Sequence, residues 1–210
     1  TEGQALAFVL VNSALFVLTT WFMNPLVFAL SPVALAVVLG YSYTKRFTAL
    51  CHLVLGLGLA LAPVGAYLAV TAAFAWAPVV LGCAVLCWVA GFDIIYALQD
   101  EHFDRENKLH SIPAWLGGKG ALRLSRGLHL LAAALLLVFY YLVESHWLLG
   151  VATVLFILLL IRQHTLVGVN RLEKVNLAFF TTNGVASILY GVLTIVSLII
   201  QVEPGRLSVF

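Results

Sequence analysis

Five of the nine acidic residues in this chain fall within one short segment, at Asp93, Asp100, Glu101, Asp104 and Glu106. On one uninterrupted helix, Asp93, Asp100 and Asp104 would lie within about 40° of the same face. Asp100 and Asp104 would be about 6 Å apart along its axis, close enough to share one hard cation or two neighbouring ones. Mg2+ is the expected cation, because it is commonly held by one or two carboxylates together with phosphate oxygens of a substrate.

A solvated helix end is the simpler interpretation of residues 100–108, because mixed charges are ordinary at a membrane surface. It accounts for Glu101 and Glu106 but leaves Asp93 unexplained, since Asp93 would lie about two helical turns deeper. Carboxylates beside hydrocarbon are costly, so Asp93 indicates a functional site in a chain of which 63% is hydrophobic.

Residues of opposite charge lie in a second segment, Tyr41-Ser42-Tyr43-Thr44-Lys45-Arg46. Lysine offers a point charge and arginine a planar fork of donors, a combination suited to a diphosphate. A Lys-Arg pair at a helix end is also a common topology anchor, and tyrosines often mark the membrane interface. Facing the acidic segment, however, the pair would complete a cradle for a phosphate leaving group.

Membrane-spanning helices must position these two segments. The mean hydropathy of +1.07 and repeated apolar stretches of about 20 residues are typical of an integral membrane protein. Solidly apolar runs such as residues 130–142 favour helices over the alternating pattern of a membrane barrel. The sequence predicts an all-α, polytopic transmembrane bundle, one domain over residues 1–210, with about seven spans at residues 3–23, 26–41, 49–71, 76–99, 121–143, 147–163 and 176–200.

The basic residues predict the orientation of this bundle. Ten of the eleven lysines and arginines lie around the connections after the second, fourth and sixth spans, and Arg206 is the exception. The connections at the other ends of the helices carry none. By the positive-inside tendency the charged side is cytoplasmic, and it also holds the acidic segment. We therefore expect a charged substrate group to be handled on that side.

Other polar residues give weaker signals. The last span carries a polar stripe of Asn176, Asn183, Ser187 and Tyr190, which predicts interhelical hydrogen bonds or the lining of a substrate cavity by residues such as Asn183. The histidines show no ligand spacing to one another, so no histidine metal site is expected. The glycine-rich run at residues 116–120 lacks Walker spacing and is expected to be a flexible connection before the fifth span.

One stretch resembles a known family motif. The run Asp93-Ile94-Ile95-Tyr96-Ala97-Leu98-Gln99-Asp100-Glu101-His102-Phe103-Asp104-Arg105, followed by Leu109-His110-Ser111-Ile112-Pro113, resembles the second aspartate-rich motif of UbiA-type intramembrane prenyltransferases. The chain is most similar to the 4-hydroxybenzoate polyprenyltransferase branch and its menaquinone-pathway relatives. Residues 41–47 and 55–67 resemble the same branch, and the resemblance extends through most of the chain. A departure is Trp115, where relatives often carry arginine.

The resemblance implies a magnesium-dependent enzyme that transfers a polyprenyl group from an allylic diphosphate to an aromatic, hydroxybenzoate-like acceptor in quinone biosynthesis. Asp100 and Asp104 would then hold Mg2+, and Lys45 with Arg46 would stabilise the departing diphosphate. Asp93 would orient or deprotonate the acceptor, and Tyr41 would contact the diphosphate or the isoprenoid end. Both 4-hydroxybenzoate and a hydroxylated naphthoate satisfy this aromatic-ring mechanism.

The resemblance also sets expectations for the whole protein. Its partners would be the two substrates and the lipid bilayer, with no nucleic acid among them. It would lie in a bacterial inner membrane, with the active site on the cytoplasmic side. The family normally has nine spans and a first aspartate-rich motif near its beginning. Because that motif and two preceding spans are missing here, we expect the chain to be N-terminally incomplete.

Two other function classes fit parts of the sequence. A cation transporter could use Asp93 and the neighbouring carboxylates, with Gly56, Gly58 and Pro63 interrupting a helix. No inverted repeat supports it, and the acidic residues are concentrated in one segment rather than in two halves. A noncatalytic membrane protein of the same fold is the third possibility, because the first motif is missing.

Overall fold

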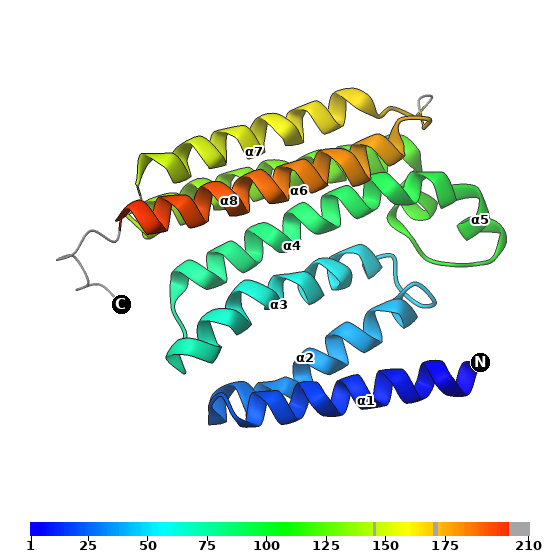
Figure 1. Ribbon diagram of the computed structural model, residues 1–210. Helices are drawn as coiled ribbons and strands as arrows, with labels where there is room; N and C mark the ends of the chain where they lie inside the picture. The colour runs from blue at the N-terminus through cyan, green and yellow to red at the C-terminus, as the bar shows by residue number, and fades with distance from the viewer. Residues whose placement is uncertain (145, 170–171, 202–210) are drawn as a thin grey trace.

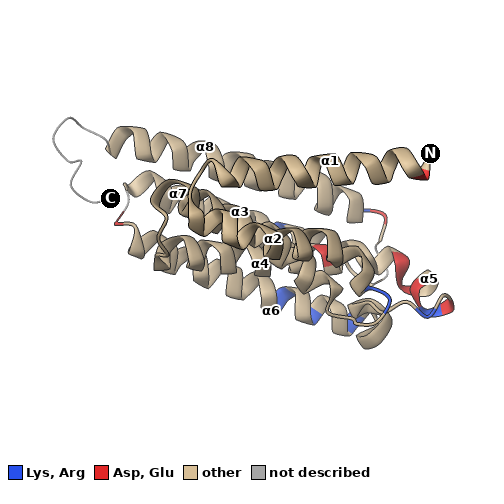
Figure 2. Cartoon of the chain, turned by 90° about the horizontal axis from the view of Figure 1, so that it is seen from below, with Lys and Arg blue, Asp and Glu red and all other residues tan. Residues whose placement is uncertain are grey.

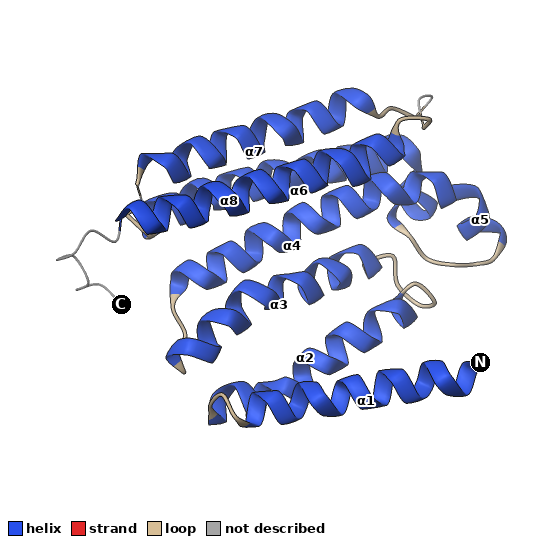
Figure 3. Cartoon of the chain, viewed as in Figure 1, coloured by secondary structure: helices blue, strands red, loops and turns tan. Residues whose placement is uncertain are grey.

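The computed structural model describes residues 1–144, 146–169 and 172–201, and its elements there are all helices (Figure 3). Seven helical segments in this part of the chain are long and apolar enough to cross a membrane. The predicted all-α bundle with about seven spans is therefore confirmed. The elements are α1 (Glu2–Trp21), α2 (Pro25–Thr44), α3 (Cys51–Thr71), α4 (Trp76–Tyr96), the 3-10 helix η1 (Ala97–Asp100), α5 (Glu101–Glu106), α6 (Ile112–Leu142), α7 (Trp147–Leu166), the π-helix η2 (Leu177–Thr182) and α8 (Asn183–Gln201).

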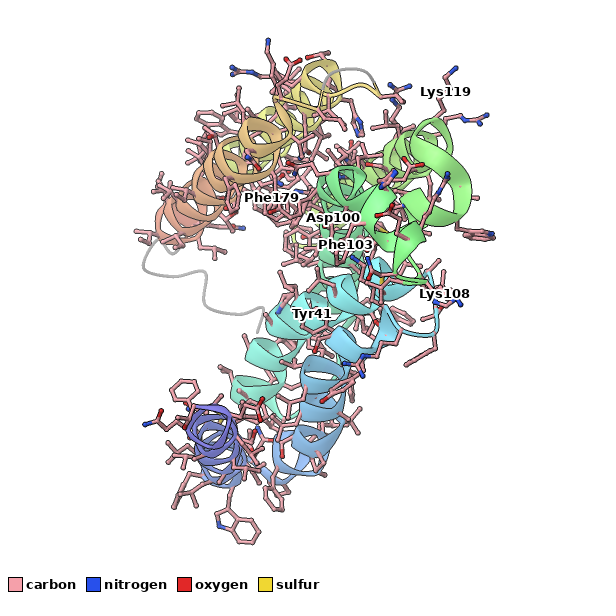
Figure 4. The ribbon with its side chains drawn as sticks, turned by 90° about the vertical axis from the view of Figure 1, so that its right-hand side faces the viewer. Tyr41, Asp100, Phe103, Lys108, Lys119 and Phe179 are labelled. Atoms are coloured by element: carbon pink, nitrogen blue, oxygen red, sulfur yellow. The ribbon has the colours of Figure 1, made fainter. Side chains whose placement is uncertain are left out.

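The long helices follow one another in space as they do along the chain. Helix α1 packs against α2, α2 against α3, and α3 against α4. Helix α4 then packs against α6, α6 against α7, and α7 against α8. Seen along the helices, this order makes an open arc with α1 and α8 at its two ends (Figures 1 and 4). The tightest region is the centre of the arc, where α4 contributes fully buried side chains such as Val89, Ile94 and Ile95.

Glycine allows α3 and α4 to approach this closely. A Cβ atom added at Gly56 of α3 would lie 2.5 Å from the Leu86 carbonyl oxygen of α4. Gly82 of α4 faces α3 in the same way, with the Ala60 carbonyl oxygen 3.0 Å from the place of a Cβ atom. Small residues at such crossings allow backbones to pack closely within a membrane, where dispersion contacts supply much of the helix association.

Capping residues fix the starts of α2 and α6. Asn24 caps α2, with its side chain accepting a hydrogen bond from the Val27 N–H, and Pro25 occupies the first helical position, where no N–H is needed. Ser111 caps α6 in the same way through the Ala114 N–H. Ser111 is also fully buried, so the start of α6 is anchored inside the protein.

The start of α6 differs from the expectation. Residues 116–120 were expected to form a flexible connection, but they lie within α6, which begins at Ile112 rather than near residue 121. Gly117 breaks the helical geometry there with φ of 67°, a value that glycine adopts without the steric cost of a Cβ atom. The run is thus a kink inside a helix, and the expectation of a flexible connection is wrong.

The π-helix η2 changes the register of the last span. Of the predicted polar stripe, Asn183 is buried and Tyr190 is half-buried, whereas Asn176 and Ser187 are exposed. Because a π turn contains more residues than an α turn, the face that holds Asn176 does not continue into α8. The expectation that all four residues face the bundle interior is therefore correct for two of them.

Charge is distributed unevenly along the helices. Among the described residues, the lysines and arginines lie toward the end of the bundle that carries α5, and the acidic residues of α5 lie at the same end (Figure 2). We call this region the charged end. It contains the connection between α2 and α3 and the segment from η1 to the start of α6.

Candidate active site

The acidic segment does not form one continuous helix. Helix α4 ends at Tyr96, η1 follows over Ala97–Asp100, and α5 begins at Glu101. A 3-10 helix turns through about 120° per residue rather than 100°, so the shared face calculated for Asp93, Asp100 and Asp104 is lost. Asp100 is exposed, whereas Asp104 is fully buried. The expectation that these three carboxylates converge is wrong, and no cluster of three metal-ligating side chains forms among the described residues.

Asp104 instead faces the basic segment. The Nζ atom of Lys45 lies 2.7 Å from its Oδ1 atom, and the Lys45 side chain is 33% exposed whereas the carboxylate has no exposure. Apart from this ion pair, the structure gives Asp104 no hydrogen-bond partner among the described residues. The backbone also joins the two segments, since the His110 N–H donates to the Lys45 carbonyl oxygen at 2.8 Å. The predicted opposition of a negative and a positive wall is thus present between Asp104 and Lys45.

The other predicted anion-binding residues are less closely engaged. Arg46 is exposed, and its guanidinium carbon lies 5.3 Å from the centre of the Tyr43 ring, a cation–π contact. Tyr41 is 39% exposed near the end of α2. Figure 4 shows Tyr41 and Asp100 on different helices at the charged end, with Lys108 and Lys119 toward its periphery. Arg46 and Tyr41 are therefore accessible to a ligand, whereas Lys45 already has a partner.

Asp93 lies deeper, on α4, and is held by a residue that sequence reasoning did not select. The His52 Nδ1 atom lies 2.6 Å from the Asp93 Oδ2 atom, and the Asp93 side chain is 21% exposed. His52 is the second residue of α3 and lies 41 positions before Asp93 in the chain. The sequence pointed to His52 only through its position near the basic segment. A contact between two different helices produces no regular spacing in the sequence that could have identified the pair.

Aromatic side chains extend from the charged end into the bundle. Phe179 of η2 packs on Tyr96 and Phe92 of α4, with ring centres 4.3 and 5.2 Å apart. Phe92 in turn contacts Trp88 at 5.4 Å. The Trp88 Nε1–H donates to the Asn183 Oδ1 atom at 3.3 Å, while the Asn183 Nδ2 atom is buried without a hydrogen-bond partner in the described structure. Asn183 is thus oriented by α4 and keeps one unused donor.

Trp115 lies beside the basic segment, at the surface. It is 67% exposed and lines a pocket together with Phe47, Leu50, Arg105 and His110. The Arg105 Nε–H donates to the Ala114 carbonyl oxygen at 3.2 Å, and its Nη2 atom lies 3.0 Å from a Glu101 oxygen. An arginine from α5 therefore lines the same pocket as Trp115.

The residues present are compatible with a hard cation whose remaining ligands are water and substrate oxygens. They are too few to bind it with protein ligands alone. The Oδ2 atom of buried Asp104 has no hydrogen-bond partner among the described residues, and Asp100 offers an exposed carboxylate one turn earlier. Mg2+ keeps several waters and usually takes one or two carboxylates plus substrate phosphate oxygens, so two aspartates are a sufficient protein contribution. The ammonium group of Lys45 supplies positive charge to Asp104 in the structure described here.

Comparisons with known proteins agree with this architecture. The sequence model of the UbiA prenyltransferase family matches residues 1–185. The apo structure of a UbiA homolog from Aeropyrum pernix K1 superimposes with a TM-score of 0.85 at 33% identity, covering 94% of this chain and 74% of that chain. The family match includes every residue of the candidate site, because the site lies within residues 1–185.

Curated relatives match shorter segments. A 4-hydroxybenzoate octaprenyltransferase of Francisella tularensis subsp. novicida (strain U112) is 36% identical over 101 residues, which is 47% of this chain and 34% of that protein. A lycopene elongase/hydratase of Corynebacterium glutamicum is 39% identical over 70 residues, which is 33% of this chain and 23% of that protein. The chain thus matches about a third or less of the length of these relatives.

Proposed function

This chain belongs to the UbiA prenyltransferase family, and from that premise we propose that the protein transfers a polyprenyl group from an allylic diphosphate to a hydroxybenzoate-like aromatic acceptor. The observation that carries the proposal is the buried Asp104 carboxylate 2.7 Å from the Lys45 ammonium, at the charged end of a bundle of membrane-spanning helices. This pairing places a cation ligand and an anion ligand side by side, as binding of a metal diphosphate requires. The name of the Francisella relative supports the choice of acceptor class.

In the proposed reaction the allylic carbon–oxygen bond breaks, and the diphosphate leaves with the bonding electron pair. Lys45 is partly exposed, so its ammonium can stabilise the departing charge, and Arg46 and Tyr41 are accessible beside it. Asp104 and Asp100 would hold Mg2+, which supplies further neutralisation of charge on the diphosphate when it is bound. The electrostatic work is thereby divided between fixed positive side chains and the metal.

The remaining allylic cation then forms a bond to a ring carbon of the acceptor. The faces of Phe179 and Phe92 are the aromatic surfaces proposed to stabilise that cation. Asp93 accepts the proton of the acceptor hydroxyl during attack and returns it to the oxygen afterwards. The ring carbon loses its hydrogen as a proton to diphosphate or water, so one prenyl group replaces one hydrogen.

Location and pathway form part of the same proposal. Basic residues at the charged end favour a cytoplasmic active site in a bacterial inner membrane. A prenylated hydroxybenzoate would serve quinone biosynthesis of the ubiquinone type, and a prenylated hydroxynaphthoate would serve that of the menaquinone type. Replacing 4-hydroxybenzoate by a hydroxylated naphthoate in the assay distinguishes these two acceptors.

The test is prenyl transfer by the full-length protein in lipid nanodiscs, followed by mass spectrometry of the product. We expect carbon prenylation that requires Mg2+ and is abolished by EDTA. Asp104→Asn should lower kcat/KM at least about 100-fold, because the lost metal contact is worth several kcal/mol. Asp100→Asn should also reduce turnover.

Glu106→Gln is the matched control, because Glu106 is an exposed acid on the same short helix and contacts only exposed His102 in the described structure. It should retain turnover close to that of the unmodified protein. Unchanged turnover in a folded Asp104→Asn variant would contradict the proposed metal site. Cation flux through liposomes without donor consumption would instead favour transport.

A further inference from the structure

His52 connects three helices through both nitrogen atoms of its ring. Its side chain is 4% exposed and projects from the start of α3. Nδ1 lies 2.6 Å from Asp93 Oδ2 on α4, and the Ile112 backbone N–H of α6 donates to Nε2 at 3.3 Å. The imidazole is therefore held between a carboxylate and the first backbone N–H of α6.

This arrangement determines where the ring carries its proton. A backbone N–H can only donate, so Nε2 must present a lone pair to Ile112. The proton of a neutral ring is then on Nδ1, which donates to Asp93 Oδ2. Because Ser111 caps α6 and is fully buried, the Ile112 N–H is itself fixed in place. The protein backbone thus sets the tautomer and the orientation of the donor to Asp93.

The same contact leaves one oxygen of Asp93 available. Within the described residues, the hydrogen bond to Asp93 comes from His52 and engages Oδ2, while the carboxylate remains 21% exposed. A carboxylate with one oxygen fixed and the other accessible can receive a proton in a defined direction. The hydrogen bond from His52 also gives the carboxylate a polar partner at a depth where an unpartnered polar group would be costly.

We infer that His52 is a positioning residue, which holds Asp93 so that its Oδ1 atom faces the acceptor hydroxyl; this inference rests on the proposed function. His52 itself touches neither substrate. Its contribution is the orientation of the acceptor base, so its loss should lower the rate of transfer rather than the binding of the diphosphate donor. Misplacement of a reacting group by about 1 Å can cost about 100-fold in rate.

Substitutions of His52 by side chains of different length and polarity test this positioning role. The amide of glutamine can donate to Asp93 and accept from Ile112, whereas the shorter asparagine reaches one of these partners at a time and leucine neither donates nor accepts. In the full-length protein, His52→Gln should retain kcat within about 3-fold, while His52→Leu and His52→Asn should lower it about 10- to 100-fold. The KM for the polyprenyl diphosphate should stay unchanged in all three.

Asp93→Asn and the double variant His52→Leu/Asp93→Asn complete the cycle. If His52 acts through Asp93, the double variant should be no slower than Asp93→Asn alone, because there is no longer a carboxylate to position. Melting temperatures in detergent are measured alongside, so that a folding defect is separated from a rate defect. If His52→Leu does not fold, the comparison of His52→Asn with His52→Gln decides the question.

Equal kcat in His52→Asn and His52→Gln would overturn the inference, as would rate losses that multiply in the double variant. A proportional loss of donor binding in every His52 variant would assign the residue a purely structural role. Transfer by the unmodified protein is measured separately. Its absence would reject the proposed function, whereas activity that is insensitive to His52 would reject only this inference.

Discussion

The ion pair between Lys45 and Asp104 is the clearest electrostatic feature at the scale of single residues. Asp104 is fully buried, and the 2.7 Å approach of the Lys45 ammonium compensates for its charge. Removing one member of a buried pair leaves the other uncompensated, which is more costly than removing both. The pair therefore has a structural consequence that can be measured without any substrate.

We expect Lys45→Met to lower stability by about 1–3 kcal/mol. The value is below the roughly 3–5 kcal/mol for breaking a fully buried pair, because Lys45 is 33% exposed and solvent screens part of its charge. The double variant Lys45→Met/Asp104→Asn should recover part of this loss, since no buried charge then remains. Unfolding in detergent, followed by size-exclusion chromatography after heating, provides the measurement.

Lys119→Met serves as the control for this pair, because Lys119 is an exposed lysine at the charged end (Figure 4). It should change the melting temperature little. If Lys45→Met is no more destabilising than Lys119→Met, the ion pair contributes nothing to the folded protein and Asp104 must be compensated in another way.

At the scale of elements, the geometry of the candidate site depends on the contact between α3 and α4. His52 and Asp93 lie on these two helices, and their hydrogen bond requires the backbones to pass closely. Gly56, one turn after His52, makes this possible because it has no Cβ atom. A Cβ atom at this position would lie 2.5 Å from the Leu86 carbonyl oxygen. Backbone packing and site geometry are therefore linked.

Gly56→Ala should force α3 and α4 apart and destabilise the protein by about 1–3 kcal/mol, the usual cost of overpacking a tight contact. Gly65→Ala is the matched control on the same helix, because nothing lies within 4 Å of the corresponding Cβ position. The control should be neutral or slightly stabilising, since alanine is the better helix former. Melting temperatures of the two variants, compared side by side, test the prediction, and equal values would contradict the close approach.

At the scale of the whole molecule, the uneven charge predicts how the protein lies in the bilayer. The lysines and arginines in the described part of the chain lie toward the charged end, and the connection between α3 and α4 at the other end has none (Figure 2). Basic connections are retained on the cytoplasmic side of a membrane. The predicted orientation would place the Lys45–Asp104 pair on the cytoplasmic side, where the diphosphate group of the proposed donor would be handled.

Cysteine labelling in intact cells tests this orientation. In a background with Cys51, Cys83 and Cys87 replaced by alanine, Ala73→Cys should react with an impermeant maleimide from outside. Lys119→Cys should react only after the cells are permeabilised. Both positions are exposed, so access rather than burial controls labelling. The reverse pattern would place the charged end on the outer side of the membrane.

Much of this protein is determined by its sequence alone. Apolar stretches long enough to cross a bilayer predicted the spans, because the hydrocarbon thickness sets the length of a helix whatever its neighbours are. The predicted starts at residues 76 and 147 coincide with those of α4 and α7. Opposite charge at 45 and 104 was also predicted as one site, and the structure places these side chains together.

Tertiary structure decided the features that depend on a change of helix type or on contacts between helices. The 3-10 turn of η1 lies between Asp93 and the pair Asp100 and Asp104, and the π-helix η2 lies between Asn176 and Asn183. Both change the rotation per residue, which a calculation with constant helical period cannot include. The partnership of His52 with Asp93 joins residues 41 positions apart on α3 and α4, and only the packing of these helices brings them within 2.6 Å.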